Sequence, residues 1–349
     1  MNGDLAAIVG AGPIGLELAV AFKRLGVPYV HFDANQIGHT ISWYPRQVRF
    51  FSSTERLAIA GVPLTIEDQS KATGEQYLAY LRGVCQMHDL EVRTFERVTA
   101  VSGAAGAFEI ETESAAGRRT SRAANVVLAV GDMARPRRLE IPGEDLPHVS
   151  HYFDHPHPFF RKRLLVVGGR NSAVEAAIRC QRAGAETTIS YRGERFDEQA
   201  VKYWMTPEIE MLVKTGRVTF HPCTAPAEIT PTHVKLRAVD GGGEDRDVET
   251  DFVLLLSGYV MDATLFRIAG VELEGENGSP KFNGRTMETN VQGIYVAGTA
   301  AAGTQKRFRL FIENCHAHVE KIVRAITGRE CPFPARDVTH SGKYRLPES

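Results

Sequence analysis

The stretch that decides the fold is IVGAGPIGLELAVAFKRLG, residues 8–26. Its turn, GAGPIG at residues 10–15, follows an apolar run and leads into an alanine- and leucine-rich segment that ends at a glycine. A strand, a glycine-rich turn and a helix in this order are typical of a βαβ unit that binds a dinucleotide. One such motif is weak evidence when it stands alone, so a second copy in the same chain carries weight.

The pattern recurs as VVGGRNSAVEAAIRCQRAG, residues 166–184. The copies align without a gap, so that Gly10 matches Gly168 and Glu17 matches Glu175. Each copy continues into a second strand pattern, VPYVHFD or ETTISYR. This repeat predicts an α/β fold with two Rossmann-like, three-layer dinucleotide-binding domains. A plainer interpretation, in which both motifs are ordinary strand-to-helix turns of an α/β sheet, stays open.

The first turn has the residues that a pyrophosphate requires. Gly10 permits the sharp bend, Gly12 leaves the backbone open to the pyrophosphate, and Gly15 lets the helix pack on the strand. The helix N-terminus then presents N–H groups and a positive dipole end to the phosphates. Asp33 ends the second strand, where a carboxylate accepts hydrogen bonds from ribose hydroxyls and repels a 2′-phosphate. The first site is therefore predicted to bind FAD or NAD rather than NADP.

The second turn differs in its charge. Arg170 replaces the middle glycine, and no acid stands at the ribose position after the second strand. Arg192 and Arg195 stand there instead, and two guanidinium groups suit a 2′-phosphate. The second site is therefore predicted to bind NADPH. The alternative interpretation is that these arginines are ordinary solvated surface charges.

Two different dinucleotides on one chain indicate a reductase in which NADPH delivers a hydride to FAD. The predicted organisation is an NADPH-binding domain at 135–259 inserted into an FAD-binding domain formed by 1–134 and 260–349, the latter including a polar, proline-rich tail. The strand GIYVAG brings Gly298 to the ribityl and phosphate groups. A helix from about Phe311 directs its N-terminal dipole at the flavin pyrimidine edge, which stabilises reduced FAD.

Composition excludes several other classes of protein. The 41 basic and 42 acidic residues balance, which argues against a general nucleic-acid or membrane-surface binder. The apolar runs are too short for a membrane span, and no signal peptide is expected from MNGDLAAIVG. Five scattered cysteines without a C-x-x-C pair suit a reduced cytoplasmic compartment and exclude a local zinc ribbon or redox dithiol. They are Cys85, Cys180, Cys223, Cys315 and Cys331.

Longer motifs carry a family resemblance. YPRQVRFFSSTERLAIAGVP, HYFDHPHPFFRKRLLVVGGRNSAVEAA and METNVQGIYVAG through FIEN are more specific than the glycine turns. Through them the chain resembles the thioredoxin-reductase-like flavoproteins, and within these the YpdA group of proposed bacillithiol disulfide reductases. The resemblance covers the chain to about residue 326. It implies bound FAD, NADPH as reductant, a cytoplasmic homo-oligomer and a small-molecule disulfide or redox carrier as acceptor.

The turns and the resemblance together predict a set of cofactor-binding residues, with no catalytic side chain and no metal ligand. The predicted set is Gly10, Gly12, Pro13, Ile14, Gly15, Asp33, Ala34, Gln36, Ser42, Val98, Gly131, Gly168, Gly169, Arg170, Asn171, Ser172, Ala173, Arg192, Arg195, Gly298, Thr299, Phe311 and Ile312.

Three departures from the related families bear on the reaction. Thioredoxin reductases have a C-x-x-C dithiol at the position of residues 151–154, where this chain has no cysteine. The YpdA-like proteins typically have a cysteine where Ile14 stands here, so a mixed disulfide cannot form at that turn. The acid that usually follows the flavin-side glycine is Thr299, a departure that YpdA-like proteins share.

The acceptor stays open at this point. A low-molecular-weight disulfide, an electron-carrier protein and oxygen are candidates, as are a flavin monooxygenase and a redox sensor without turnover. Cys315, in the last predicted helix, is the one thiol that we would test for redox chemistry, although a buried small hydrophobe is its plainer interpretation.

Overall fold

The structure is a computed structural model that describes residues 4–197, 200–239, 244–305 and 309–333. It divides into two compact units. Unit 1 comprises Met1–Ser42, Gln47–Arg135 and Tyr259–Ser349, and unit 2 comprises Trp43–Arg46 and Pro136–Gly258. The chain leaves unit 1 at β6 (Arg135–Pro136) and returns at β15 (Tyr259–Val260). The assignment of one dinucleotide to each of the predicted ranges stays a prediction, and most of the predicted tail lies outside the described residues.

The sheet of unit 1 is built around parallel strands with both faces buried. Ala6, Ala7 and Ile8 of the first strand are fully buried, as are the valines near the end of the strand beside it. Such continuous apolar runs are typical of parallel strands covered on both faces. The order is β2 (Tyr29–Phe32), β1 (Asp4–Val9), β5 (Gly117–Leu128), β4 (Phe108–Ser114) and β3 (Arg97–Ser102), with β18 (Ile294–Val296) pairing with β5.

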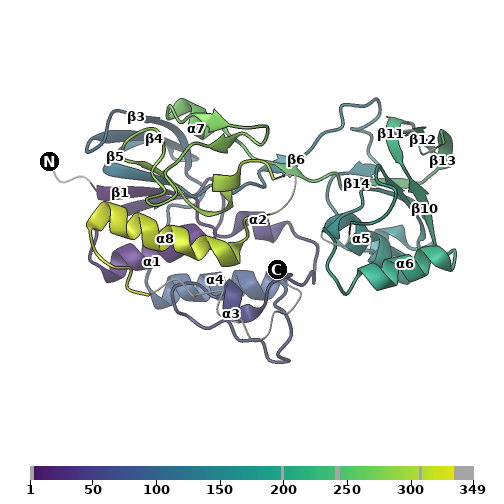
Figure 1. Ribbon diagram of the computed structural model, residues 1–349, viewed down its shortest axis with the longest axis horizontal. Helices are drawn as coiled ribbons and strands as arrows, with labels where there is room; N and C mark the ends of the chain where they lie inside the picture. The colour runs from purple at the N-terminus through teal and green to yellow at the C-terminus, as the bar shows by residue number, and fades with distance from the viewer. Residues whose placement is uncertain (1–3, 198–199, 240–243, 306–308, 334–349) are drawn as a thin grey trace. The chain divides into compact units, whose positions relative to one another are not determined.

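Helices α1 (Pro13–Arg24), α4 (Gly74–Met87) and α8 (Ile312–Thr327) lie on one side of this sheet (Figure 1). α1 has a proline in its first turn, where the missing N–H does no harm. α4 begins at a capping box in which Thr73 and Gln76 bond each other's backbone N–H. The remaining elements of the unit are α2 (His39–Ser42), α3 (Thr54–Leu57), α7 (Thr264–Ile268), β16 (Leu273–Glu274), β17 (Ser279–Pro280) and the 3₁₀ helix η2 (Gly298–Ala302).

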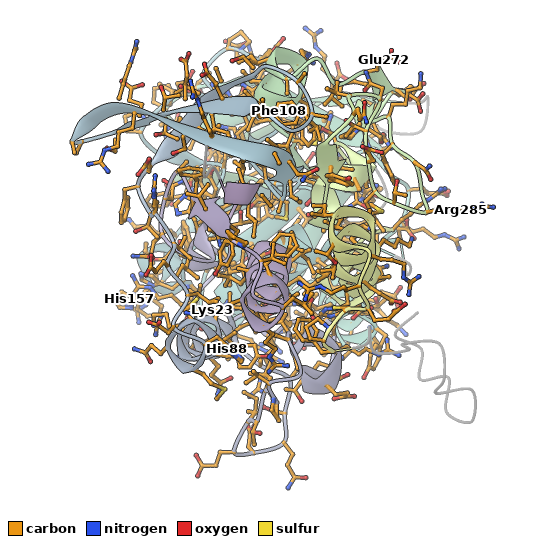
Figure 2. All side chains as sticks on the ribbon, turned by 90° about the vertical axis from the view of Figure 1, so that its left-hand side faces the viewer. Lys23, His88, Phe108, His157, Glu272 and Arg285 are labelled. Carbon is orange, nitrogen blue, oxygen red and sulfur yellow. The ribbon has the colours of Figure 1, made fainter. Side chains whose placement is uncertain are left out.

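The ends of α1 and α4 are tied together by charge. Lys23 lies next to His88 in Figure 2, and the Lys23 Nζ atom is 3.0 Å from the Asp89 carboxylate. Partial burial and the positive charges of Arg24 and Lys23 lower the pKa of His88. His88 is therefore neutral at pH 7, and the exposed ion pair beside it contributes little to stability.

Unit 2 has a parallel five-stranded sheet with a small antiparallel sheet. In Figure 1 the helices α5 (Asn171–Arg182) and α6 (Thr206–Lys214) lie beside each other in this unit. The α/β fold with two Rossmann-like units is thus confirmed. The strand order of the large sheet is β10 (Val218–Pro222), β9 (Glu186–Tyr191), β8 (Arg163–Val167), β14 (Phe252–Leu255) and β7 (Val149–Ser150). The strand order of the small sheet is β11 (Thr224–Ile229), β12 (His233–Ala238) and β13 (Arg246–Glu249). The 3₁₀ helix η1 (His157–Phe159) precedes β8.

The segment Trp43–Arg46 belongs to unit 2, although it falls within the predicted range 1–134. The Arg46 guanidinium is 2.9 Å from the Asp154 carboxylate, and the Arg46 N–H donates to the Asp154 carbonyl. The Trp43 ring meets the Tyr152 ring edge-on, with centroids 5.3 Å apart. These partners lie more than a hundred positions away in sequence, so local patterns could not reveal them.

The glutamates that align in the repeat bind buried basic side chains in both units. Glu17 Oε2 is 2.6 Å from His316 Nδ1, and His316 Nε2 is 3.0 Å from the Arg56 carbonyl. Because a carbonyl oxygen can only accept, His316 Nε2 donates to Arg56, and His316 Nδ1 shares a proton with the Glu17 carboxyl group. In unit 2, Glu175 Oε2 is 2.8 Å from Lys202 Nζ, which is also buried. Each pair fixes a later segment of the chain against the helix that follows a glycine turn.

None of the helices in the described part of the chain combines the length and the apolar character needed to cross a bilayer.

Two buried histidines predict how stability depends on pH. Burial lowers the pKa of His31 and of His318 to about 4 each. The unfolded chain takes up a proton at these residues near the ordinary value, whereas the folded chain does so only below it. Above about pH 6.5 these two residues therefore leave the free energy of unfolding at its full value. As the pH falls toward 4, proton uptake by the unfolded chain lowers the free energy of unfolding by roughly 3 kcal/mol for each group.

His31→Gln tests this dependence, since glutamine can still donate to the Gly10 carbonyl, 2.9 Å from His31 Nε2. The free energy of unfolding is measured with urea at pH 7 and pH 5. Between these values the variant is expected to lose roughly 2 kcal/mol less than the unaltered protein. Parallel losses in the two proteins would contradict the buried, neutral state of His31.

Candidate functional site

The turns predicted to bind the first dinucleotide meet at one edge of the unit 1 sheet. β1, β5 and β18 run parallel, and their last residues lie side by side, Val9 opposite Leu128 and Leu128 opposite Val296. The turns that follow them therefore converge at the carboxyl edge, where ligands bind in open α/β sheets.

The three glycines of the first turn have different surroundings. A Cβ at Gly10 would come within 2.3 Å of the Ala129 carbonyl oxygen, and one at Gly15 within 1.9 Å of the Gly10 carbonyl oxygen. A Cβ at Gly12 would meet nothing within 4 Å. Gly10 and Gly15 are therefore required by packing, whereas Gly12 borders open space. That space is where the pyrophosphate is predicted to approach.

The N-terminus of α1 points its backbone into this turn. Gly12 is the N-cap and offers no side-chain cap, and Pro13 has no N–H to satisfy. Uncapped N–H groups at a helix start attract an anion. Ile14 is 5% exposed and lies 3.6 Å from where a Cβ at Gly298 would stand, so it forms part of the wall between two of the converging turns. These features fit a bound pyrophosphate.

Asp33 lies beside the same turn. Its carboxylate accepts the N–H of Ala11 at 2.6 Å and the N–H of Asn35 at 2.8 Å. Burial raises the pKa of Asp33, while these hydrogen bonds act in the opposite direction. Each oxygen accepts one backbone hydrogen bond and retains a second lone pair, so the group can still accept from ribose hydroxyls.

The residues predicted for the adenosine side lie around the end of β2. The N–H of Glu96 donates to the Asp33 carbonyl, which brings the start of β3 and the half-buried Val98 close to Asp33. Ala34 is half-buried, and Gln36 is exposed with its Oε1 accepting the Ile37 N–H. Ser42 is also exposed, and its hydroxyl donates to the His39 carbonyl.

A polar cluster near Gly298 was not predicted from the sequence. Asp132, which follows Gly131, is only 7% exposed, and its carboxylate accepts Gln305 Nε2 at 2.8 Å. Thr299 lies beside the same turn, since its Oγ1 would be 3.9 Å from a Cβ at Gly131. Burial raises the pKa of Asp132, and the Gln305 and Thr299 side chains act in the opposite direction. No sequence signal links these residues, because Asp132 and Gln305 are 173 positions apart.

The helix α8 starts at Ile312, with Phe311 as its N-cap, as the sequence predicts. The Phe311 N–H donates to Asn314 Oδ1 at 2.8 Å, and the Phe311 side chain is 38% exposed. Cys315 is fully buried, and burial raises the pKa of its thiol. A thiol in this state is a small hydrophobe rather than a nucleophile, which supports the plainer of the two interpretations of Cys315.

The second glycine turn packs in the same way as the first. A Cβ at Gly168 would come within 2.6 Å of the Leu256 carbonyl oxygen, just as Gly10 approaches Ala129. A Cβ at Gly169 would lie 2.4 Å from the Tyr191 ring, and one at Gly193 would lie 2.6 Å from it. Both glycines therefore make room for the ring at the end of β9.

The start of α5 is held by the segment that precedes α6. The Asn171 N–H donates to the Ala200 carbonyl, and Asn171 Oδ1 accepts the Lys202 N–H at 2.6 Å. Arg170 is the N-cap without a side-chain cap, and its side chain is half-buried. Of the next two predicted residues, Ser172 is exposed and Ala173 is buried.

The two arginines predicted to bind a 2′-phosphate closely follow β9. β8 and β9 are adjacent and parallel, Val167 lying opposite Ser190, so the turns after them share the carboxyl edge. Arg192 and Arg195 are exposed there. Within the described residues neither guanidinium has a carboxylate partner. Both side chains therefore follow the strand end at which the sequence predicts the 2′-phosphate.

The cysteines do not form a redox pair. All five are free, and burial raises the pKa of Cys85 to about 11 and that of Cys180 to about 12. Burial also raises the pKa of Cys331. Within the four described ranges, no group of three or more His, Cys, Asp or Glu residues could hold a metal ion.

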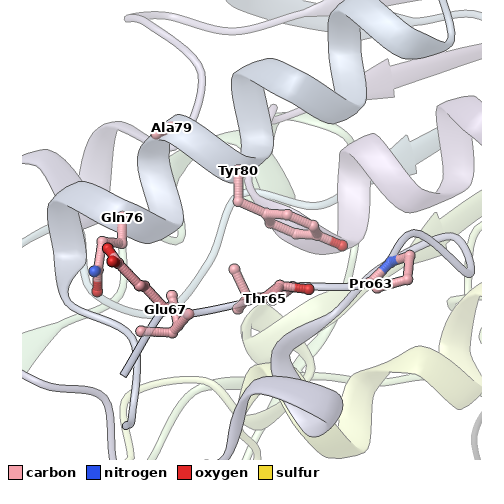
Figure 3. Close-up of a pocket in the computed structure, with 8 residues that line it drawn as sticks. Pro63, Thr65, Glu67, Gln76, Ala79 and Tyr80 are labelled. Carbon is pink, nitrogen blue, oxygen red and sulfur yellow. The ribbon is translucent and has the colours of Figure 1, made fainter. Parts of the chain in front are cut away.

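A pocket of about 410 Å³ lies elsewhere on unit 1, between α4 and the chain that precedes it (Figure 3). Its lining includes Thr65, Glu67, Gln76 and Tyr80. No residue predicted to bind a cofactor borders it, so it gives no support to the dinucleotide sites.

Known proteins resemble this chain over nearly its whole length. The family described as pyridine nucleotide-disulphide oxidoreductase matches residues 7–298. The chain is 36% identical over 330 residues to bacilliredoxin reductase Bdr of Bacillus subtilis strain 168, covering 94% of this chain and 98% of that protein. The solved structure titled bacillithiol disulfide reductase Bdr (YpdA) from Bacillus cereus is 35% identical, with a TM-score of 0.87 over 94% of this chain and all of that one. Its Staphylococcus aureus counterpart is 32% identical, with a TM-score of 0.86 over 94% and 99% of the two chains. The resemblance inferred from the motifs is confirmed.

Proposed function

The chain belongs to the pyridine nucleotide-disulphide oxidoreductase family and is an FAD- and NADPH-dependent oxidoreductase, and we propose that it reduces a low-molecular-weight disulfide of the bacillithiol type. The observation that carries the cofactor part of the proposal is the pair of glycine turns with opposite charge beside them. Asp33 stands next to the first, and Arg192 and Arg195 stand next to the second. The first turn suits a neutral ribose, and the second suits a phosphorylated one.

In this proposal the unit 1 turns hold FAD. The open backbone at Gly12 and the uncapped start of α1 bind its pyrophosphate, and Asp33 accepts from its adenosine ribose. Gly298 and Thr299 lie at the ribityl chain, and the start of α8 faces the pyrimidine edge. When bound, FAD takes a hydride from NADPH and passes two electrons to the acceptor.

The unit 2 turn holds NADPH. The start of α5 receives the pyrophosphate, with Arg170 adding a positive charge. Arg192 and Arg195 bind the 2′-phosphate through charge-assisted hydrogen bonds. The side chains orient the two cofactors and exclude water, and no protein acid or base is required for the hydride transfer itself.

The acceptor is reduced without a protein dithiol. The chain has no C-x-x-C pair, and Cys180 and Cys315 are fully buried with raised thiol pKa values. A disulfide acceptor needs two electrons and two protons to yield two thiols. The similar proteins are titled reductases of bacillithiol disulfide or of bacilliredoxin, and a small disulfide requires no docking thiol on this chain.

Anaerobic NADPH consumption tests the proposal. With bacillithiol disulfide, we expect two thiols for each NADPH oxidised, and Cys315→Ser should keep the rate within about twofold because the thiol is inert. Ile14→Cys is expected to raise the rate if a turn thiol accelerates the same chemistry. NADPH oxidation by electron-carrier proteins, combined with no thiol release from the disulfide, would exclude the proposed acceptor.

Homo-oligomerisation and a cytoplasmic location remain predictions from the resemblance and from the scattered cysteines. Light scattering coupled to gel filtration gives the molar mass, and a mass of one chain at micromolar concentration would contradict the first prediction.

A further inference from the structure

A buried carboxylate lies in the first turn of α8, and one of its oxygens has no hydrogen-bond donor. Glu313 is 8% exposed, and its Oε1 is 3.8 Å from Nη1 of Arg56 in α3. Its Oε2 is buried and accepts no hydrogen bond from any residue that the structure describes. Buried carboxylate oxygens normally accept hydrogen bonds, so an acid in this state needs positive charge beside it. The Arg56 guanidinium and the positive end of α8 supply that charge.

The backbone around Arg56 is fixed by three helices. The Arg56 carbonyl accepts His316 Nε2 of α8 at 3.0 Å, and the Tyr77 hydroxyl of α4 donates to the carbonyl of the next residue at 2.8 Å. The N–H of Ala60, a little further along, donates to Glu17 of α1 at 3.0 Å. This framework holds the position from which the Arg56 side chain reaches the start of α8.

We propose that the Arg56–Glu313 pair sets the reduction potential of the FAD bound to unit 1, and that Glu313 holds this potential down. In the proposed binding of FAD, the start of α8 faces the pyrimidine edge, which gains negative charge on reduction. The helix N-terminus favours that charge, and the Glu313 carboxylate in the same turn opposes it. Neither side chain has to touch the flavin. A unit charge about 10 Å away, at an effective dielectric constant of about 20, still shifts an equilibrium roughly tenfold.

The inference rests on the proposed binding of FAD to unit 1, but it is independent of the acceptor. Glu313→Gln tests it, because the change removes one negative charge and keeps the shape, while the Arg56 guanidinium stays charged. Reduced FAD should then be favoured roughly tenfold more than in the unaltered protein, which is a rise of about 30 mV for a two-electron couple. The measurement is the midpoint potential of the bound FAD at pH 7, taken anaerobically in equilibrium with a redox dye of known potential.

A second change separates an effect of charge from a disturbed fold. Arg56→Met combined with Glu313→Gln removes both charges, so the equilibrium should return to within about twofold of the original, or about 10 mV. Arg56→Met alone should not raise the potential, because a buried Glu313 without its partner either keeps its negative charge or takes up a proton. A purely structural role would give the double variant losses at least as large as those of Glu313→Gln.

Glu96→Gln is the matched control. Glu96 is also a buried acid of unit 1, and its Oε1 is also 3.8 Å from an arginine, Arg93. It precedes β3, beside the strand end at which the adenosine is predicted, rather than the start of α8. Its replacement should change the equilibrium by less than about twofold, or about 10 mV.

Three results would overturn the inference: an unaltered potential in Glu313→Gln, a raised potential that persists when Arg56→Met is added, or an equal rise in Glu96→Gln. If Glu313→Gln does not fold, Glu313→Ala decides the question, since it removes the charge without burying an amide and should give the same rise. A preparation that binds no FAD would instead refute the proposed function, which none of the other outcomes does.

Discussion

Gly12→Val is expected to leave the chain folded and to abolish FAD binding. Gly12 has φ −75° and ψ −179°, which any residue adopts, and a Cβ there meets no protein atom within 4 Å. The side chain would occupy the space through which a pyrophosphate reaches the backbone of the turn. We expect the purified variant to be colourless, with an affinity for added FAD at least about a hundredfold weaker, equivalent to roughly 3 kcal/mol.

The control for this prediction is Gly83→Ala, at a helical glycine in α4 that also has open space around it. Alanine there should stabilise the helix by up to about 1 kcal/mol and leave FAD content unchanged. Circular dichroism should show native secondary structure in both variants. If Gly12→Val retains a full complement of FAD, the pyrophosphate does not bind at this turn.

Replacing both Arg192 and Arg195 with alanine is expected to weaken NADPH binding roughly a hundredfold or more and to change NADH binding little. Two charge-assisted hydrogen bonds to the 2′-phosphate would be lost, each of roughly 1.5–3 kcal/mol, and NADH has no such phosphate. Both side chains are exposed, so the free energy of unfolding should change by less than about 0.5 kcal/mol. The KM values for the two nucleotides provide the measurement.

Arg237→Ala is the matched control, because Arg237 is an exposed arginine on β12 of the same unit. It should leave the preference between the nucleotides unchanged. Raising salt should weaken NADPH binding to the unaltered protein more than NADH binding, as expected for an exposed phosphate contact. Equal losses for the two nucleotides in the double variant would refute the 2′-phosphate assignment.

The glycine turns could be predicted from sequence because their requirements are local. Gly10 and Gly168 adopt positive φ values of 108° and 138°, and each approaches a carbonyl at the end of a neighbouring strand. A strand, a turn and an amphipathic helix in sequence order are sufficient to predict both. The start of α8 could also be predicted, since FIEN lies at a change from loop to helical periodicity.

The contacts that support the sites could not be predicted in the same way. Glu17 and His316 are separated by 299 positions, and nothing near either residue indicates the other. Asp132 and Gln305 meet only because β5 and β18 are adjacent in the sheet. A signal did exist for these two acids, because Glu17 and Glu175 occupy the same place in the repeat. Their partners, an imidazole and an ammonium, depend on tertiary packing alone.

Anaerobic titration of the purified protein with NADPH tests whether the chain binds FAD and whether NADPH reduces it. We expect a yellow protein with one FAD per chain, whose visible flavin absorption is bleached stoichiometrically by NADPH. A colourless protein that takes up no added FAD, or a bound flavin that stays oxidised in excess NADPH, would contradict this expectation.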